Sequence, residues 1–89
     1  MNNRFKALIA ATLFFLAHGL FAGQAININE ASAEEMAEAL TGVGQARAEA
    51  IVEFREEHGR FMSADDLALV SGVGEVTVER NRERIRVDD

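Results

Sequence analysis

Two stretches of the sequence, thirty residues apart, carry the same arrangement of glycine and aliphatic residues. LTGVG at 40–44 is matched by VSGVG at 70–74, and a run typical of a helix follows each copy. Glycine adopts positive φ angles and allows a close approach of the backbone, so the step suits a tight turn between helices. The repeat predicts two similar units, each with a short helix, a Gly-Val-Gly turn and a second helix.

Local start and stop signals place the helices of these units. Ser32 and Glu35 have capping-box spacing at the start of a first helix, and Ser63 with Asp66 marks a later one. Apolar residues at i, i+3 and i+4 predict a helix over 45–58, which Gly59 ends. The residues expected to face inward are Met36, Leu40, Ala48, Ile51, Val52, Phe54, Phe61, Leu67, Val70, Val78 and Ile85. Residues 26–89 lack the alternation typical of strands, so the sequence predicts an all-α domain of about four to five short helices.

The first 25 residues have the composition of an export signal. Arg4 and Lys6 precede a long uncharged apolar run, and the small residues around Ala25 suit a signal-peptidase site. The pattern predicts cleavage after Ala25, which leaves one domain of residues 26–89. The alternative is a retained membrane anchor, because residues 7–25 approach the ~20 residues that a bilayer span needs.

Removal of residues 1–25 takes away both of their basic residues and no acidic residue, so the net charge changes from −6 to −8. This acidity does not exclude phosphate binding, because a helix N-terminus offers unpaired backbone N–H groups and a partial positive charge. The two turns are therefore candidate phosphate sites, with Val43 and Val73 pointing inward as anchors. The same turns could also serve only to join packed helices.

The sequence predicts no enzyme, no cofactor and no metal site. His58 stands alone beside a predicted helix end, where capping is expected, and there is no cysteine. The carboxylates are numerous but lack the clustered spacing of a metal site.

Several motifs in order resemble a known family. LTGVGQARAEAI is similar to the helix-hairpin-helix motif, and nearly all of residues 26–89 resembles the ComEA family of competence-type DNA-binding domains. The resemblance includes the N-x-N-x-A-S-A-E-E opening, the central G-x-F-x-S-x-D-D-L and the closing N-R-E-R-I. It implies two tandem helix-hairpin-helix motifs in a periplasmic protein that binds double-stranded DNA regardless of sequence. After cleavage of the export signal, no stable membrane insertion is expected. The resemblance further implies a role in DNA uptake, with components of an uptake pore or pilus as partners.

The resemblance also implies two DNA-binding sites. The first comprises Gly42, Val43, Gly44, the amides of Gln45 and Ala46, and the basic side chain of Arg47. The second comprises Gly72, Val73, Gly74, the amide of Val76 and the hydroxyl of Thr77. The second copy departs from the family pattern, because Glu75 stands where Pro is common and Val76 where a basic residue is common. We therefore expect the second site to be the weaker one.

Two questions stay open at the level of sequence. Arg80, Arg82, Arg84 and Arg86 form a basic concentration that could contact DNA or simply complement a helix C-terminus. In addition, the same fold can act as a protein-interaction or structural module. The PsbU-type extrinsic proteins of photosystem II resemble such a reuse of the fold. The net charge of −8, Glu75 and the lack of lysine in residues 26–89 favour that alternative.

Overall fold

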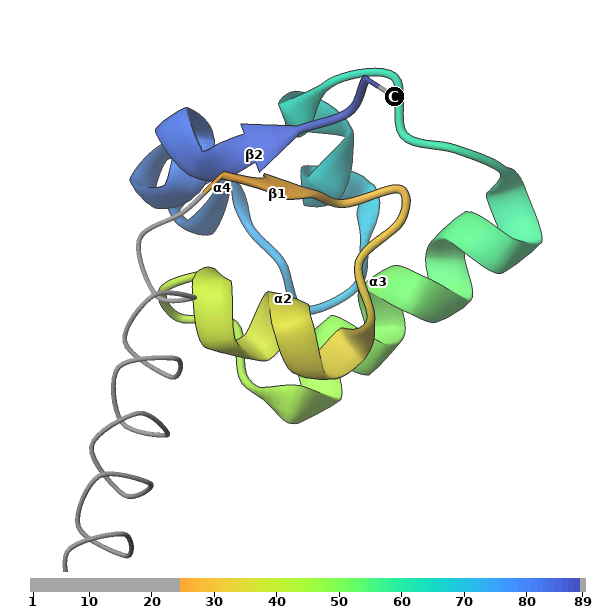
Figure 1. Ribbon diagram of the computed structural model, residues 1–89, viewed down its shortest axis with the longest axis horizontal. Helices are drawn as coiled ribbons and strands as arrows, with labels where there is room; N and C mark the ends of the chain where they lie inside the picture. The colour runs from red at the N-terminus through yellow and green to blue at the C-terminus, as the bar shows by residue number, and fades with distance from the viewer. Residues whose placement is uncertain (1–24, 89) are drawn as a thin grey trace, which may run out of the picture.

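A computed structural model describes residues 25–88, which fold as two helical units closed by a very short sheet (Figure 1). The expected export signal lies outside the described residues, apart from Ala25. In chain order the elements are β1 (Ile26–Asn27), α2 (Ala33–Ala39), α3 (Gln45–His58), the 3-10 helix η1 (Ala64–Leu69), α4 (Glu75–Asn81), the 3-10 helix η2 (Arg82–Arg84) and β2 (Ile85–Arg86). Within residues 25–88, no helix is both long and apolar enough to cross a membrane.

The first unit follows its local signals closely. The Ser32 hydroxyl accepts a hydrogen bond from the Glu35 N–H at 3.1 Å, and the Glu35 carboxylate accepts one from the Ser32 N–H at 2.9 Å. This reciprocal capping box starts α2 as predicted. Helix α3 has the predicted bounds and ends at Gly59, whose φ of 90° is open to glycine and strained for other residues.

The second unit differs from the prediction at both ends. The segment after Ser63 is a 3-10 helix, and the Asp66 carboxylate accepts the N–H groups of Met62 and Ser63 at 2.8 and 3.3 Å. Helix α4 stops at Asn81, so Ile85, which was expected to face inward, lies beyond the helix in β2. The chain leaves the helix there because Ile85 and the residue after it pair with β1.

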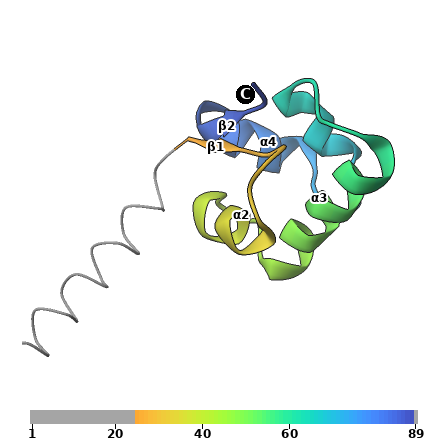
Figure 2. The same cartoon turned by 45° about the vertical axis from the view of Figure 1, so that its right-hand side comes forward.

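The expectation of no strand is wrong for the two ends of the described chain. β1 and β2 pair in parallel, with Ile26 opposite Ile85 and Asn27 opposite Arg86, and both views show them side by side (Figures 1 and 2). Two-residue strands are too short to show an alternating pattern, so periodicity could not reveal them. The domain remains predominantly helical, as predicted.

Asn29 connects three segments of the chain close to the β1–β2 pair. Its side-chain oxygen accepts the Phe61 N–H at 2.7 Å, and its Nδ2 donates to the carbonyls of Phe61 and Val87, both at 3.0 Å. One amide therefore joins the segment after β1, the loop after α3 and the chain after β2.

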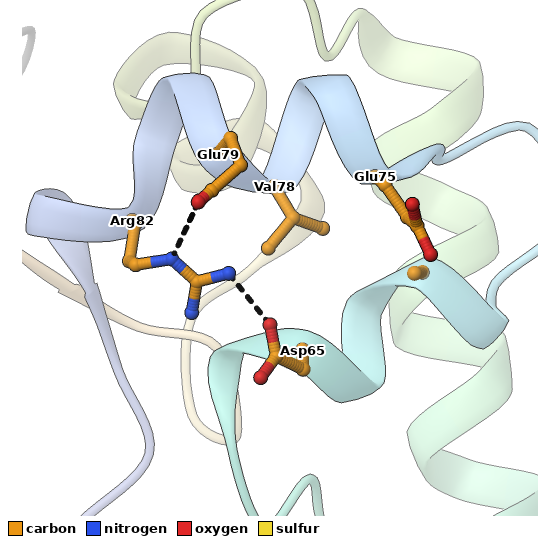
Figure 3. A pocket seen from close by; sticks show the side chains of 6 residues that line it. Asp65, Glu75, Val78, Glu79 and Arg82 are labelled. Carbon is orange, nitrogen blue, oxygen red and sulfur yellow. Dashed lines mark hydrogen bonds and ion pairs between the residues drawn. The ribbon is translucent and has the colours of Figure 1, made fainter.

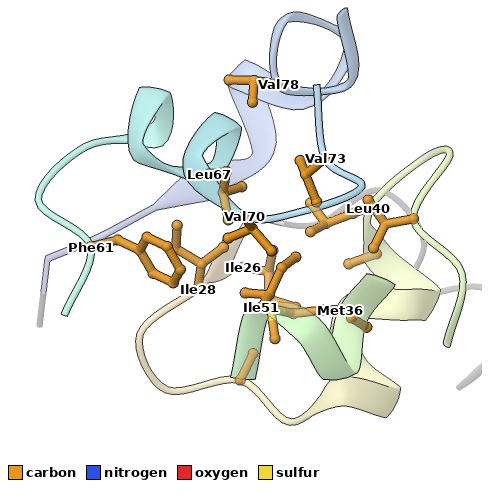
Figure 4. Close-up of a cluster of buried hydrophobic side chains, with 14 residues drawn as sticks. Ile26, Ile28, Met36, Leu40, Ile51, Phe61, Leu67, Val70, Val73 and Val78 are labelled. Atoms are coloured by element: carbon orange, nitrogen blue, oxygen red, sulfur yellow. The ribbon is translucent and has the colours of Figure 1, made fainter. Parts of the chain in front are cut away.

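The core confirms most of the residues predicted to face inward (Figure 4). Phe61 is 1% exposed, and the repeat positions match closely, since Val43 and Val73 are 3% and 4% exposed. Val52, Phe54 and Ile85 are only partly buried against this cluster. The buried apolar residues are Ile26, Ile28, Ala31, Met36, Ala39, Leu40, Val43, Ala48, Ile51, Phe61, Leu67, Val70, Val73 and Val78.

Only the first glycine of each turn has a positive φ. Gly42 and Gly72 have φ of 81° and 90°, whereas Gly44 and Gly74 are extended N-caps with φ of −82° and −101°. The second glycine of each pair therefore does not use the positive φ that glycine allows, because the chain has already reached the ordinary N-cap conformation there.

Asn81 joins the two units from a buried position. It is 2% exposed, its Oδ1 accepts the Thr41 N–H at 2.7 Å, and its Nδ2 donates to the carbonyls of Thr41 and Thr77 at 2.9 and 2.8 Å. The side chain thus satisfies both backbone groups of the residue that precedes Gly42 and holds α4 against the first turn.

Asn81→Ala should lower the free energy of unfolding by about 1–3 kcal/mol, because the backbone groups of Thr41 lose their partner. The thermal midpoint, followed by circular dichroism, should fall by roughly 4–24 °C for a domain of this size. Glu83→Ala, at an exposed position of η2, serves as the control and should change stability by less than about 0.5 kcal/mol. Equal midpoints for the two variants would contradict the bridging role.

The paired alanine variants Gly42→Ala and Gly44→Ala should differ in stability. Alanine at position 42 must adopt a positive φ, which costs about 1–2 kcal/mol. At position 44 the φ is ordinary and the added Cβ meets no heavy atom within 4 Å, so a change under about 0.5 kcal/mol is expected. Urea unfolding would measure both values, and a Gly44→Ala loss as large as that of Gly42→Ala would refute the assignment.

Candidate functional site

The first hairpin, which comprises α2, the turn at residues 42–44 and α3, presents an open helix N-terminus. Gly44 caps the 14-residue helix α3 without a side-chain hydrogen bond, and Gln45, Ala46 and Arg47 are exposed. The N–H groups of a first helical turn have no intrahelical acceptor, and the helix dipole adds partial positive charge. A Cβ on Gly44 would meet nothing within 4 Å, so contacts within the described chain do not require glycine there. The missing side chain leaves the helix end accessible to an external group.

The second hairpin, which comprises η1, the turn at residues 72–74 and α4, has the same backbone form but a less favourable setting for an anion. Gly74 is again an open N-cap, yet α4 has only seven residues and begins with the exposed carboxylate of Glu75. Val76 is 71% exposed, and Thr77 is partly buried with its carbonyl bonded to Asn81.

An acidic groove lies beside this second hairpin, between η1 and α4 (Figure 3). Its lining residues are Asp65, Ala68, Glu75, Val78, Glu79 and Arg82. The Arg82 guanidinium is 2.9 Å from Glu79 and 2.6 Å from Asp65. Hydrogen bonds to Glu79 and then to Asp65 raise the pKa of Arg82 above its already high ordinary value. This arginine is therefore charged but held by carboxylates, and the groove carries more acidic than basic groups.

Arg47 crosses from the first unit to the second turn. Its Nε donates to the Gly72 carbonyl at 2.8 Å, and a Cβ built on Gly72 would lie 3.6 Å from the Arg47 Cγ and Nε. The structure thus brings together two residues that the sequence analysis assigned to separate sites. The guanidinium braces the two turns against each other.

Arginines of the second unit reach the first turn in return. A Cβ built on Gly42 would lie 3.5 Å from Nη1 of Arg80. Arg84 donates from Nη1 to the Thr41 hydroxyl at 3.0 Å and to the Ala39 carbonyl at 3.4 Å. The sequence marked these arginines only as members of a basic concentration and offered no signal to separate them.

The four arginines of residues 80–86 therefore divide into two pairs. Arg80 and Arg84 lie at the first turn, whereas Arg82 contacts Asp65 and Glu79, and Arg86 is 3.4 Å from Asp88. The four arginines lie on three different elements, with Arg80 in α4, Arg82 and Arg84 in η2 and Arg86 in β2.

Within residues 25–88, no group of three or more His, Cys, Asp or Glu side chains is placed to hold a metal ion. His58 packs on Phe54, with ring centroids 4.4 Å apart, at the exposed C-terminal end of α3. The described part of the chain thus offers open helix termini and arginines as its distinctive chemistry.

Comparisons with known proteins agree with this geometry. Residues 22–86 match the family described as "Helix-hairpin-helix motif". A protein of Haemophilus influenzae, named only as an uncharacterized protein, is 52% identical over 60 residues, which are 67% of this chain and 54% of that protein. ComE operon protein 1 of Bacillus subtilis is 45% identical over 65 residues, which are 73% of this chain and 31% of that protein.

A further similarity is limited to a small segment of much longer proteins. Endonuclease/exonuclease/phosphatase family domain-containing protein 1 of Homo sapiens is 51% identical over 55 residues, which are 62% of this chain but 10% of that protein. The chain thus spans about half the length of the Haemophilus relative and under a third of the Bacillus relative. The family match covers more than half of the chain, and the two glycine turns join helices as such a motif requires. The chain therefore belongs to the helix-hairpin-helix family, with a domain similar to part of ComE operon protein 1.

Proposed function

We propose that this protein binds double-stranded DNA without sequence preference, mainly through phosphate contacts at the first hairpin. The observation that carries the proposal is the exposed N-terminus of α3, where Gly44 leaves the space above the helix end open. Gly42, Val43, Gly44 and the amides of Gln45 and Ala46 form this site, with Arg47 beside it. Backbone N–H groups at a helix N-terminus bind phosphate without help from the overall charge.

Contacts of this kind position a protein on the duplex but do not read base edges, so binding independent of sequence is expected. With few cationic contacts, the dissociation constant should lie near the 10⁻⁴–10⁻⁶ M typical of non-specific binding. The net charge of −8 on residues 26–89 repels DNA at long range, so association should be slow at low ionic strength.

The second hairpin, with Gly72, Val73, Gly74, the Val76 amide and the Thr77 hydroxyl, is proposed as a weaker contact. Glu75 places a carboxylate at the start of α4, and the adjacent groove is acidic. Its main contribution is then structural, since it supports the first turn through Asn81.

We further propose that residues 1–25 direct export, that residues 26–89 act in the periplasm, and that the role is to hold DNA during uptake. The order of an export-type leader followed directly by this domain supports the idea, as does the similarity to ComE operon protein 1. Components of an uptake pore or pilus are the corresponding partners. Binding, rather than catalysis, is the proposed activity.

One second candidate has a specific observation in its favour. The acidic groove and the exposed apolar side chains of Met62, Leu69 and Val76 suit a protein-interaction module better than a DNA-binding surface. The two candidates differ in what they require of the first hairpin, because a protein module does not need an open space at Gly44.

The test compares residues 26–89 with the variants Gly44→Asp, Gly74→Asp and Arg47→Glu on a labelled duplex across a range of salt concentrations. Aspartate is a favoured N-cap, so each glycine variant should remain folded while placing a carboxylate where phosphate would bind. We expect micromolar binding that weakens with salt, a loss of at least about tenfold in Gly44→Asp, and a smaller loss in Gly74→Asp. Arg47→Glu should also weaken binding.

Circular dichroism would confirm the fold of each variant. Absence of wild-type binding even at about 50 mM salt would end the DNA proposal and favour the protein-interaction candidate.

Glu75→Gln should strengthen DNA binding at low salt by roughly two- to fivefold, because it removes a carboxylate from the start of α4. The gain should shrink as salt screens the remaining charges. Glu56→Gln, which removes the same charge near the C-terminal end of α3, is the matched control. If the two variants gain equally, Glu75 has no local effect on a phosphate.

A further inference from the structure

We propose that Arg80 is a phosphate-binding residue of the first hairpin, although it belongs to the helix that follows the second. This inference rests on the proposed DNA-binding function and assigns one further residue to its site. It also gives the second unit a role that its own acidic surroundings do not suggest.

The guanidinium of Arg80 is placed at the first turn and is available there. Its Nη1 lies 3.5 Å from the position of a Cβ on Gly42, and the residue is exposed. Among the described residues, Arg80 makes no hydrogen bond or ion pair. The other described arginines each contact a carbonyl, a hydroxyl or a carboxylate: Arg47, Arg55, Arg60, Arg82, Arg84 and Arg86.

The helix that carries Arg80 is held at the first turn by the next residue in sequence. Asn81 binds both the N–H and the carbonyl of Thr41, the residue before Gly42, and so fixes α4 beside the turn. Arg84 binds the Thr41 hydroxyl and adds a second guanidinium at the same place. The backbone of α4 therefore cannot shift away from Gly42 without breaking these bonds.

Arg80 adds to the first turn a positively charged group that can bind phosphate. A guanidinium presents five N–H donors in a planar fork that matches phosphate oxygens, and it stays charged at every relevant pH. The residue expected to provide charge, Arg47, already donates its Nε to the Gly72 carbonyl and acts as a positioning residue between the turns. Each turn thus has beside it an arginine from the other unit.

The experiment measures binding of a labelled duplex to the full chain in nonionic detergent, with Arg80→Gln, Arg80→Lys and Arg60→Gln. Arg60 follows Gly59 at the opposite end of α3, roughly 20 Å from the first turn, so its substitution removes the same charge far from the site. We expect Arg80→Gln to weaken binding about five- to tenfold at about 50 mM salt and to reduce the salt slope by about 0.9. Arg60→Gln should change affinity less than twofold, and Arg80→Lys should restore part of the loss.

A double variant tests which hairpin Arg80 serves. If Arg80 and the first turn hold the same phosphate, the losses in Arg80→Gln and Gly44→Ala should combine to less than the product of the two. Fully independent losses would overturn the assignment to the first hairpin.

The outcome also separates this inference from the function on which it rests. Wild-type binding with equal affinities for Arg80→Gln and Arg60→Gln would overturn the role of Arg80 and leave DNA binding intact. Absence of wild-type binding would overturn both.

Discussion

The contact between Asn81 and the backbone of Thr41 is the interaction on which the arrangement of the two units depends. One buried side-chain amide replaces the peptide partner that a strand or helix would normally provide, and it does so for both the donor and the acceptor. The third bond returns to the Thr77 carbonyl within the same helix, so both N–H donors of the amide are used and its oxygen accepts one hydrogen bond. This contact fixes α4 against the first turn, and the cross-unit arginines depend on that placement.

The internal repeat produces two turns of the same backbone form with different electrostatic surroundings. Gly42 and Gly72 share a positive φ, and Val43 and Val73 share a buried position. Each turn also has an arginine of the other unit beside it, but only the second turn borders an acidic groove. The two copies of the repeat therefore share a backbone conformation but differ in the charged residues around them. For this reason the proposed DNA binding involves mainly the first copy.

The acidity of the chain is compatible with this assignment because the groups that matter are local. Screening by salt limits the range over which exposed charges interact to about 8–10 Å at physiological ionic strength. Distant carboxylates therefore contribute little to the electrostatic potential at a turn. The backbone N–H groups of α3 and the nearby guanidiniums act within that range. Long-range repulsion then affects the rate of encounter more than the contact itself.

The sequence by itself determined the helices, their caps and the two glycine turns, because these depend on residues within four positions of one another. The Ser32–Glu35 capping box and the bounds of α3 are examples. Tertiary structure decided the β1–β2 pairing, the role of Asn81 and the exchange of Arg47 and Arg80 between turns. These contacts join residues far apart in sequence, 40 apart for Thr41 and Asn81 and 25 apart for Arg47 and Gly72. No local period encodes them, and only the packing of one unit on the other selects which arginine meets which turn.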